Sequence, residues 1–164
     1  MWTTNLTVGS LVSRFLQDMA KHLEKSILPY TQDQLFELVA DVERYPEFVP
    51  CWLDASVRRR DGDIVLVEQV LNIAAIRHRF VSKAVLLRPS SVQVTSSDGS
   101  FRHLDIRWQI EPQSGSSCTL MLSTDFQLRS GMLQTLLSGF FRGETWRLLK
   151  VFENRAHTLY GHTL

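Results

Sequence analysis

The sequence predicts an α+β domain in which a curved antiparallel sheet wraps around a long C-terminal helix. An amphipathic segment closes the chain, a succession of short alternating segments precedes it, and one helical hairpin lies near the start. From about residue 130 to 160, apolar residues recur at steps of three and four with charged residues between them. A helix of about thirty residues would extend roughly 45 Å, about the width of a small domain. One such helix can therefore lie across a whole sheet.

The composition is that of a globular domain with a core of its own. The chain of 164 residues is long enough for one such domain, and its net charge of +1 argues against a general nucleic-acid binder, so we expect no DNA partner. Two cysteines, Cys51 and Cys118, are too few for a disulfide framework and lack the spacing of a zinc site. We expect both to be reduced, buried thiols, and we expect no metal site.

The first twenty residues are expected to form a tail or a short amphipathic helix ahead of a domain that spans residues 21–161. They mix apolar residues with Arg14 and Asp18, unlike a secretory signal, and have too little basic charge for a good presequence. No apolar run approaches the ~20 residues that cross a bilayer. We expect a cytoplasmic protein that can lie peripherally at the inner membrane, or at the mitochondrial inner membrane if the source is eukaryotic.

A first strand over residues 22–30 is expected to lead into a kinked helical hairpin. Thr31-Gln-Asp-Gln34 fits a capping box, because the threonine can accept from the amide three residues on and the glutamine can reach back. Residues before proline are pushed out of the helical region, so the helix should break at Tyr45, before Pro46. The hairpin then ends in an apolar corner over residues 48–52.

Six more strands are expected after this corner, separated by turns such as Asp61-Gly62, Ala74-Ala75 and Asp98-Gly99. Apolar and polar residues alternate most cleanly in the last two, so one face of each should be buried and the other solvated. The expected strands cover residues 53–58, 64–73, 77–87, 92–94, 104–110 and 120–128.

Four segments of the chain resemble the coenzyme Q-binding, START-like family of the polyketide cyclase-like superfamily, which includes the ribosome-association toxin RatA. They are Val39-Ala-Asp-Val-Glu-Arg-Tyr-Pro-Glu-Phe-Val-Pro50, Asp98-Gly-Ser-Phe-Arg-His-Leu104, Arg107-Trp108 and the closing residues 156–161. The resemblance covers about residues 22–161. The family has the helix-grip fold, which agrees with the order of elements derived above. The chain departs from the family at the tunnel mouth and the central hairpin, where Trp52 replaces a common cysteine, Ala75 a glycine and Ser100 a proline.

The resemblance implies a hydrophobic tunnel between the sheet and the long helix. We predict non-enzymatic binding of coenzyme Q (ubiquinone) or a related isoprenoid lipid there, as a bound ligand and not a catalytic cofactor, in support of respiratory electron transport or quinone biosynthesis. Burial of apolar area contributes roughly 25 cal/mol per Å² before the costs of association, so apolar walls alone can supply affinity. Apolar side chains also serve as core. The candidate walls are Phe48, Val49, Trp52, Phe101, Trp108, Phe126, Leu137, Phe140, Phe141 and Trp146.

Three alternatives stay open. Arg142, Arg147, Lys150 and Arg155 on the last helix suit either an anionic membrane surface or a solvated face. The basic clusters at residues 58–60 and 77–79 can meet RNA phosphates of a ribosome, or can be hairpin ends balanced by nearby acids. A cyclase-like enzyme requires inward-facing acids or bases, whereas the inward positions of the cleanest strands are mostly apolar. The chain has none of the common nucleophile, phosphate-loop or metal motifs, so no catalytic residue is predicted.

Overall fold

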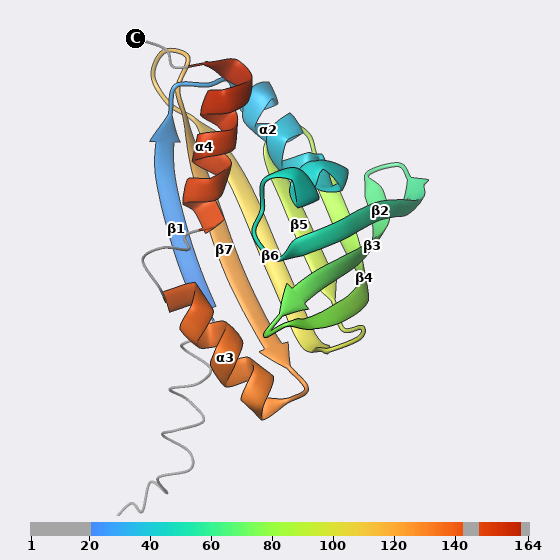
Figure 1. Ribbon diagram of the computed structural model, residues 1–164. Helices are drawn as coiled ribbons and strands as arrows, with labels where there is room; N and C mark the ends of the chain where they lie inside the picture. Colours follow the sequence, from blue (N-terminus) through green and yellow to red (C-terminus); the bar gives the residue numbers. More distant parts are fainter. Residues whose placement is uncertain (1–20, 143–147, 162–164) are drawn as a thin grey trace, which may run out of the picture.

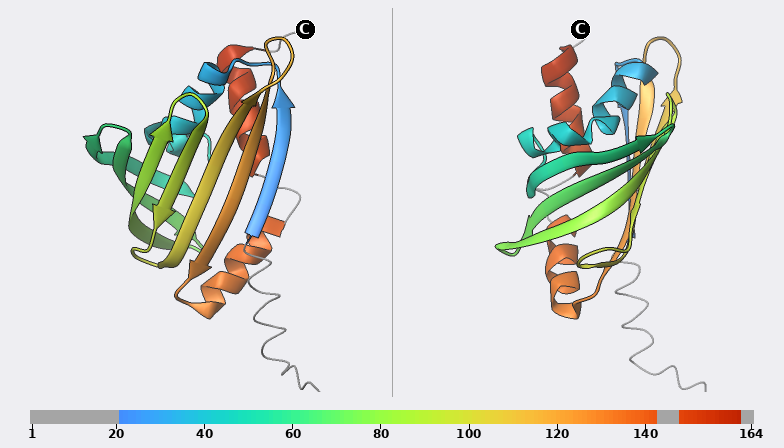
Figure 2. Two further views of the ribbon diagram at one scale, coloured as in Figure 1. Left: turned by 180° about the vertical axis from the view of Figure 1, so that it is seen from behind. Right: turned by 90° about the vertical axis from the view of Figure 1, so that its right-hand side faces the viewer.

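The computed structural model describes residues 21–142 and 148–161, with side chains described for residues 23–136 and 148–161. Seven strands form one antiparallel sheet in the order β1-β7-β6-β5-β4-β3-β2. The helices lie on one face of this sheet, which curves around them (Figures 1 and 2). The predicted α+β, helix-grip fold is confirmed. In chain order the elements are β1 (Lys21–Leu28), α2 (Gln32–Ala40), η1 (Val42–Glu47), β2 (Trp52–Asp61), β3 (Ile64–Ile73), β4 (Ile76–Leu87), β5 (Ser91–Ser96), β6 (Phe101–Pro112), β7 (Cys118–Leu128), α3 (Gly131–Arg142) and α4 (Leu148–Tyr160).

The seven predicted strands are all present, and the alternation of side chains determines which face of each is buried. In β7 every second residue from Cys118 to Leu128 is buried. The chain passes from the edge strand β1 to the opposite edge strand β2 through α2 and η1, which cross the concave face (Figure 1). Two register shifts between β2 and β3, at Trp52/Asp54 and Val57/Arg59, mark bulges. Bulges increase the local bend of a strand, which favours the curvature of this edge of the sheet.

The helical hairpin begins as predicted and ends differently. The Thr31 hydroxyl accepts from the amide of Gln34 at 3.2 Å, and the Gln34 side chain accepts from the amide of Thr31 at 2.9 Å, so the capping box is confirmed. The predicted break at Tyr45 is wrong: α2 ends at Ala40, and Tyr45 lies inside the 3-10 helix η1. Tertiary packing explains the difference, because the buried Tyr45 donates its hydroxyl hydrogen to the Val39 carbonyl at 2.6 Å.

The periodicity predicts one long C-terminal helix over about residues 130–160, and the structure describes residues 131–142 and 148–160 of it as helical. The structure has two helices, α3 and α4, whose axes point in different directions (Figure 1), and residues 143–147 between them lie outside the described part. The sequence contains Gly139 and Gly143, and glycine costs about 1 kcal/mol relative to alanine inside a helix. The α4 helix supplies the core contact, because the Phe152 ring is fully buried with its centroid 4.5 Å from that of Trp108.

The Asp98-Gly99 turn shows why a glycine is needed between β5 and β6. Gly99 has a φ of +61°, and a Cβ atom on it would come within 2.4 Å of the Arg79 carbonyl oxygen. The Asp98 carboxylate accepts from the amide of Val81 at 2.7 Å, which fastens the turn to β4. The predicted turn is confirmed, and its sequence is required by close approach of the backbone of a neighbouring strand.

Candidate functional site

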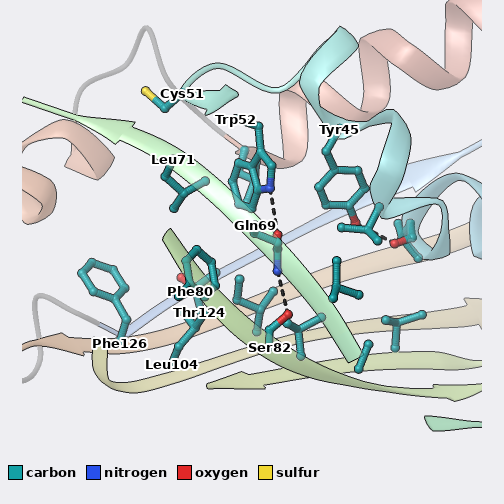
Figure 3. A pocket seen from close by; sticks show the side chains of 18 of the residues that line it. Tyr45, Cys51, Trp52, Gln69, Leu71, Phe80, Ser82, Leu104, Thr124 and Phe126 are labelled. Atoms are coloured by element: carbon teal, nitrogen blue, oxygen red, sulfur yellow. Dashed lines mark hydrogen bonds between the residues drawn. The ribbon is translucent and has the colours of Figure 1, made fainter. Parts of the chain in front are cut away.

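A cavity of about 290 Å³ lies between the concave face of the sheet and the helices (Figure 3). Its volume is at the lower end of the range of roughly 300–1,000 Å³ that is usual for small-molecule sites. Among the residues with described side chains, the inward-facing side chains of β3 to β7 supply most of its wall, with one residue of α3 and two of α4. The wall residues include Val65, Val67, Phe80, Ala84, Val92, Val94, Leu104, Ile106, Leu136, Leu148 and Phe152.

The cavity has a mouth where lining residues are themselves exposed or half-exposed: Pro50, Cys51, Asn72, Ala74 and Leu136. The Cys51 carbonyl accepts from the amide of Asn72 at 2.8 Å, so the bend before β2 is tied to the end of β3. Cys51, Ala74 and Ala75 have φ values of 69°, 53° and 63°. Backbone strain is thus concentrated at this mouth, because left-handed conformations are unfavourable for residues with a side chain.

One chain of hydrogen bonds crosses the apolar wall (Figure 3). The Trp52 indole Nε1–H donates to the Gln69 side-chain oxygen at 2.8 Å, and the Gln69 amide nitrogen donates to the Ser82 hydroxyl at 2.7 Å. An indole N–H can only donate, so the carbonyl of the Gln69 amide must face Trp52 and its nitrogen must face Ser82. Gln69 and Ser82 are 3% and 1% exposed, so the order of donors in this chain is determined inside the protein.

A second buried hydroxyl, that of Thr124 on β7, also lines the cavity and is 6% exposed. We find no hydrogen bond from it to the residues that the structure describes. Thr124 occupies the position of an apolar residue in the alternating inward set of β7. It is thus a polar group on an inward face whose hydrogen-bonding capacity the described protein does not use.

The described lining carries little ionisable chemistry. Arg60 is the one charged residue among the described residues of the wall, and its side chain is exposed. Burial raises the pKa of the Cys51 thiol and raises the pKa of the Tyr45 phenol far above its usual range. Both groups therefore stay protonated at neutral pH. The described wall can donate hydrogen bonds and pack against apolar groups, but it presents no carboxylate or imidazole for proton transfer.

The structure brings part of the predicted set to the cavity. Trp52, Phe101, Trp108 and Phe126 line it. Val49 is buried in the core instead, and Phe48 packs edge-on against Phe152 with ring centroids 5.1 Å apart. The side chains of Leu137, Phe140 and Phe141 on α3, and Trp146 as a whole, lie outside the described part. A binding role for each of the ten residues stays a prediction.

Gln69, Ser82 and Thr124 are polar lining residues that are absent from the predicted set. Residues 64–73 are a nearly continuous apolar run, in which a period of two is hard to detect. In β4, however, the outward-facing Lys83 sets the phase and places Ser82 inward beside Phe80 and Ala84. A polar residue at an inward-facing position of a strand was therefore the sequence signal that could have identified a polar lining residue.

Other predicted features have mixed outcomes. Cys118 is buried and both cysteines are free, but Cys51 is half-buried at the mouth of the cavity, so its predicted full burial is wrong. Arg58 and Arg79 both contact Glu68, and the hydrogen bond from Arg58 holds the pKa of that carboxyl below its usual range. The described residues contain no cluster of His, Cys, Asp and Glu that could hold a metal. None of the helices in the described part is long and apolar enough to cross a membrane.

Comparisons with known proteins agree with the fold. The family model described as "Polyketide cyclase / dehydrase and lipid transport" matches residues 28–153. The ribosome association toxin RatA of Pseudomonas aeruginosa is 30% identical over 145 residues, which cover 87% of this chain and 100% of that protein. The mitochondrial coenzyme Q-binding protein COQ10 homolog B of Xenopus laevis is 28% identical over 145 residues, 86% of this chain and 59% of that protein. The solution structure of the 18 kDa protein CC1736 from Caulobacter crescentus has 31% identity and a TM-score of 0.68, covering 87% of this chain and 99% of that one.

Proposed function

Because the chain belongs to the polyketide cyclase / dehydrase and lipid transport family, we propose that it binds coenzyme Q or a related isoprenoid quinone and does not transform it. The observation that carries this proposal is the apolar cavity between the concave face of the sheet and α4. A relative of this chain is named as a coenzyme Q-binding protein, which supports the quinone as the ligand. The bound quinone would serve respiratory electron transport or quinone biosynthesis.

The size of the cavity bears on how such a ligand is held. At about 290 Å³ the cavity suits a ring and the first part of a prenyl chain, so the rest of a long chain would leave through the mouth. Met132 and Leu136 on α3 are 74% and 50% exposed, and Leu136 belongs to the mouth. Exposed apolar side chains beside the exit would contact a bilayer peripherally when the ligand enters or leaves.

Ribosome association is the second candidate, and the 30% identical toxin RatA is the observation that favours it. Charge in the described part gives it limited support. Arg59 lies 3.5 Å from Asp61, and Arg58 and Arg79 contact Glu68, so much of the basic clusters is balanced by acids. A cyclase activity also occurs within the description of the family, but it requires an acid or base in the cavity, and the described wall is mostly apolar.

Organic extraction and mass spectrometry of the protein, purified gently from a quinone-producing host, test the proposal. We expect a co-purifying quinone, and Ala84→Phe should abolish its retention because Ala84 is a small residue of the cavity wall. Val81→Phe is the matched control, since Val81 lies on the outward face of the same strand. Thermal unfolding of both variants separates loss of ligand from loss of fold.

An empty protein that also takes up no quinone from liposomes would contradict the proposal. Sedimentation with ribosomes then separates the alternatives. Association that disappears with added salt indicates contacts with RNA phosphates. If the protein does not associate with ribosomes, the cyclase activity is the remaining hypothesis. Product analysis with an aromatic polyketide substrate can test it.

A further inference from the structure

The chain of hydrogen bonds from Trp52 through Gln69 ends at the Ser82 hydroxyl, which can still donate its hydrogen. Oγ of Ser82 accepts from the Gln69 amide, so the hydroxyl hydrogen of Ser82 remains to be donated. No acceptor for this hydrogen is found among the residues that the structure describes. A buried donor without an acceptor costs free energy, and buried polar groups in native proteins are rarely left in that state. Because each group from Trp52 to Ser82 donates to the next, the Ser82 hydroxyl needs an acceptor that lies within the cavity.

Thr124 presents a second hydroxyl to the same cavity. The register places Thr124 opposite Ile106 of β6, Ile106 opposite Val94 of β5, and Val94 opposite Ala84 of β4. Thr124 thus lies three strands from β4, roughly 14 Å along the sheet at about 4.8 Å per strand. The sheet curves (Figure 2), and Ser82 and Thr124 border the cavity from two strands that are well separated along it.

We infer that the cavity recognises a neutral ligand with acceptor oxygens on opposite edges of a ring, such as a quinone, through the hydroxyl groups of Ser82 and Thr124. A ring with a carbonyl at each edge presents two acceptors, one for each of the two hydroxyls. The described lining offers no buried charge to pair with a charged head, because Arg60 is the one charged residue of the described wall and is exposed. This inference rests on the proposed function. It adds that the two hydroxyls make the cavity prefer a quinone to an isoprenoid hydrocarbon that has no oxygen.

Thr124→Val is the sharpest test, because valine keeps the shape and removes a hydroxyl that has no partner in the described protein. We expect its affinity for a short-chain ubiquinone to fall roughly threefold to tenfold, the effect of one net hydrogen bond. Its affinity for an isoprenoid hydrocarbon of similar length, which has no oxygen, should not fall. The unfolding midpoint should stay equal or rise, since a cavity-facing hydroxyl without a partner among the described residues is replaced by an apolar group. Thr119→Val is the matched control, because Thr119 lies on the opposite face of the same strand.

Infrared spectra of the bound quinone supply a second measurement. A hydrogen bond lowers the stretching frequency of a carbonyl, so Thr124→Val should shift one carbonyl band of bound ubiquinone upward and leave the other in place. Ser82→Ala should shift the other band. The corresponding control is Ser123→Ala, on the outward face of β7.

The outcomes separate this inference from the proposed function. Quinone binding by the native chain that Thr124→Val and Ser82→Ala leave unchanged in affinity and in carbonyl bands would overturn the inference, with ordered water as the partner of the hydroxyls, and would leave the proposed function in place. Equal affinity of the native chain for the hydrocarbon and the quinone would overturn it in the same way. Failure of the native chain to bind any quinone would overturn both.

Discussion

The indole Nε1–H of Trp52 on the edge strand β2 donates a hydrogen bond of 2.8 Å to the side-chain oxygen of Gln69 on β3. The two residues are 17 positions apart in the sequence, and Trp52 lies immediately after the bend at the mouth of the cavity. This one bond joins the mouth to the polar groups on the cavity wall. It also determines the orientation of the Gln69 amide, and through it the role of Ser82.

Removal of this bond should lower stability by a measurable amount. Gln69→Leu leaves the Trp52 indole N–H without its acceptor, and we expect a decrease in the free energy of unfolding of about 1–3 kcal/mol. In combination with Trp52→Phe, the loss should be about 1 kcal/mol smaller than the sum of the single losses, because the two residues share the bond. Urea unfolding of the single and double variants measures this coupling.

Gln109→Leu is the control for Gln69→Leu, since Gln109 is exposed on β6. Its effect should stay within about 0.5 kcal/mol. Additive losses for Trp52→Phe and Gln69→Leu would contradict the assigned coupling.

The β3–β4 turn at the cavity mouth should respond to a better turn sequence. Ala74 and Ala75 both have positive φ, and Ile73 pairs with Ile76 across them, so they form a two-residue turn for which Asn-Gly is favoured. The double change Ala74→Asn and Ala75→Gly should raise the free energy of unfolding by about 1 kcal/mol, because it relieves left-handed strain that exceeds the entropy cost of glycine. Ala75→Val should have the opposite effect, since β-branched residues tolerate positive φ poorly. Equal effects of the two changes in urea unfolding would count against this account.

The ion pairs of Glu47 should make stability depend on acid pH. The hydrogen bond from Arg44 holds the pKa of Glu47 below its ordinary value of 4.5, and Arg155 of α4 contributes through a 2.7 Å contact. A carboxyl whose pKa is lower in the folded state stabilises the fold above the unfolded pKa, and this contribution is lost as the pH falls through the folded pKa. The stability difference between the native chain and Glu47→Gln should therefore be largest above pH 4.5, decrease as the pH falls below 4.5, and disappear only below the lowered pKa of the folded state.

A variant without Arg44 and Arg155 supplies the control for this pH dependence. When both are changed to glutamine, Glu47→Gln should no longer lose stability preferentially above pH 4.5, because the groups that lower the pKa of Glu47 are gone. Urea unfolding midpoints measured from pH 3 to 7 test whether the two arginines cause the pH dependence. The measurements are made at low salt, since salt screens exposed ion pairs. A pH dependence that persists without the two arginines would show that another group causes it.

Cys51 should report occupancy of the cavity. It is a half-buried residue of the mouth, whereas Cys118 is buried in the core and is not part of the wall. Cys51 should therefore be alkylated faster than Cys118, although slowly for a thiol, because burial raises its pKa and the thiolate is the reactive form. Saturation with short-chain ubiquinone should slow alkylation of Cys51 severalfold.

Peptide mass spectrometry of the alkylated protein follows both thiols in one sample. Cys118 serves as an internal control for unfolding, since its burial does not depend on the cavity. Alkylation of Cys51 at the same rate with and without quinone would show that the ligand does not pass the mouth.

The sequence by itself determined the elements of the sheet. Seven segments with turns between them predicted seven strands, because alternation and turn chemistry are local properties of the chain. The capping box at Thr31 is equally local, and it forms with the predicted partners. The resemblance in the 39–50 and 98–104 segments identified the fold. Four of the predicted wall residues, Trp52, Phe101, Trp108 and Phe126, line the cavity because alternation or the corner sequence placed them on the buried side.

Only the tertiary structure decided which buried residues border a cavity and which fill the core. Phe48 and Trp52 belong to the same apolar corner, yet only Trp52 reaches the cavity, because Phe48 packs against Phe152 of α4, more than a hundred positions away in the sequence. The same holds for Tyr45, which a bond to Val39 holds inside η1 against its local preference. Ser82 and Thr124 face one cavity because the sheet curves across three strands, and no period in a single strand carries that information. Local sequence specifies the face of a strand, whereas the position of an unfilled space depends on the packing of all the strands and helices around it.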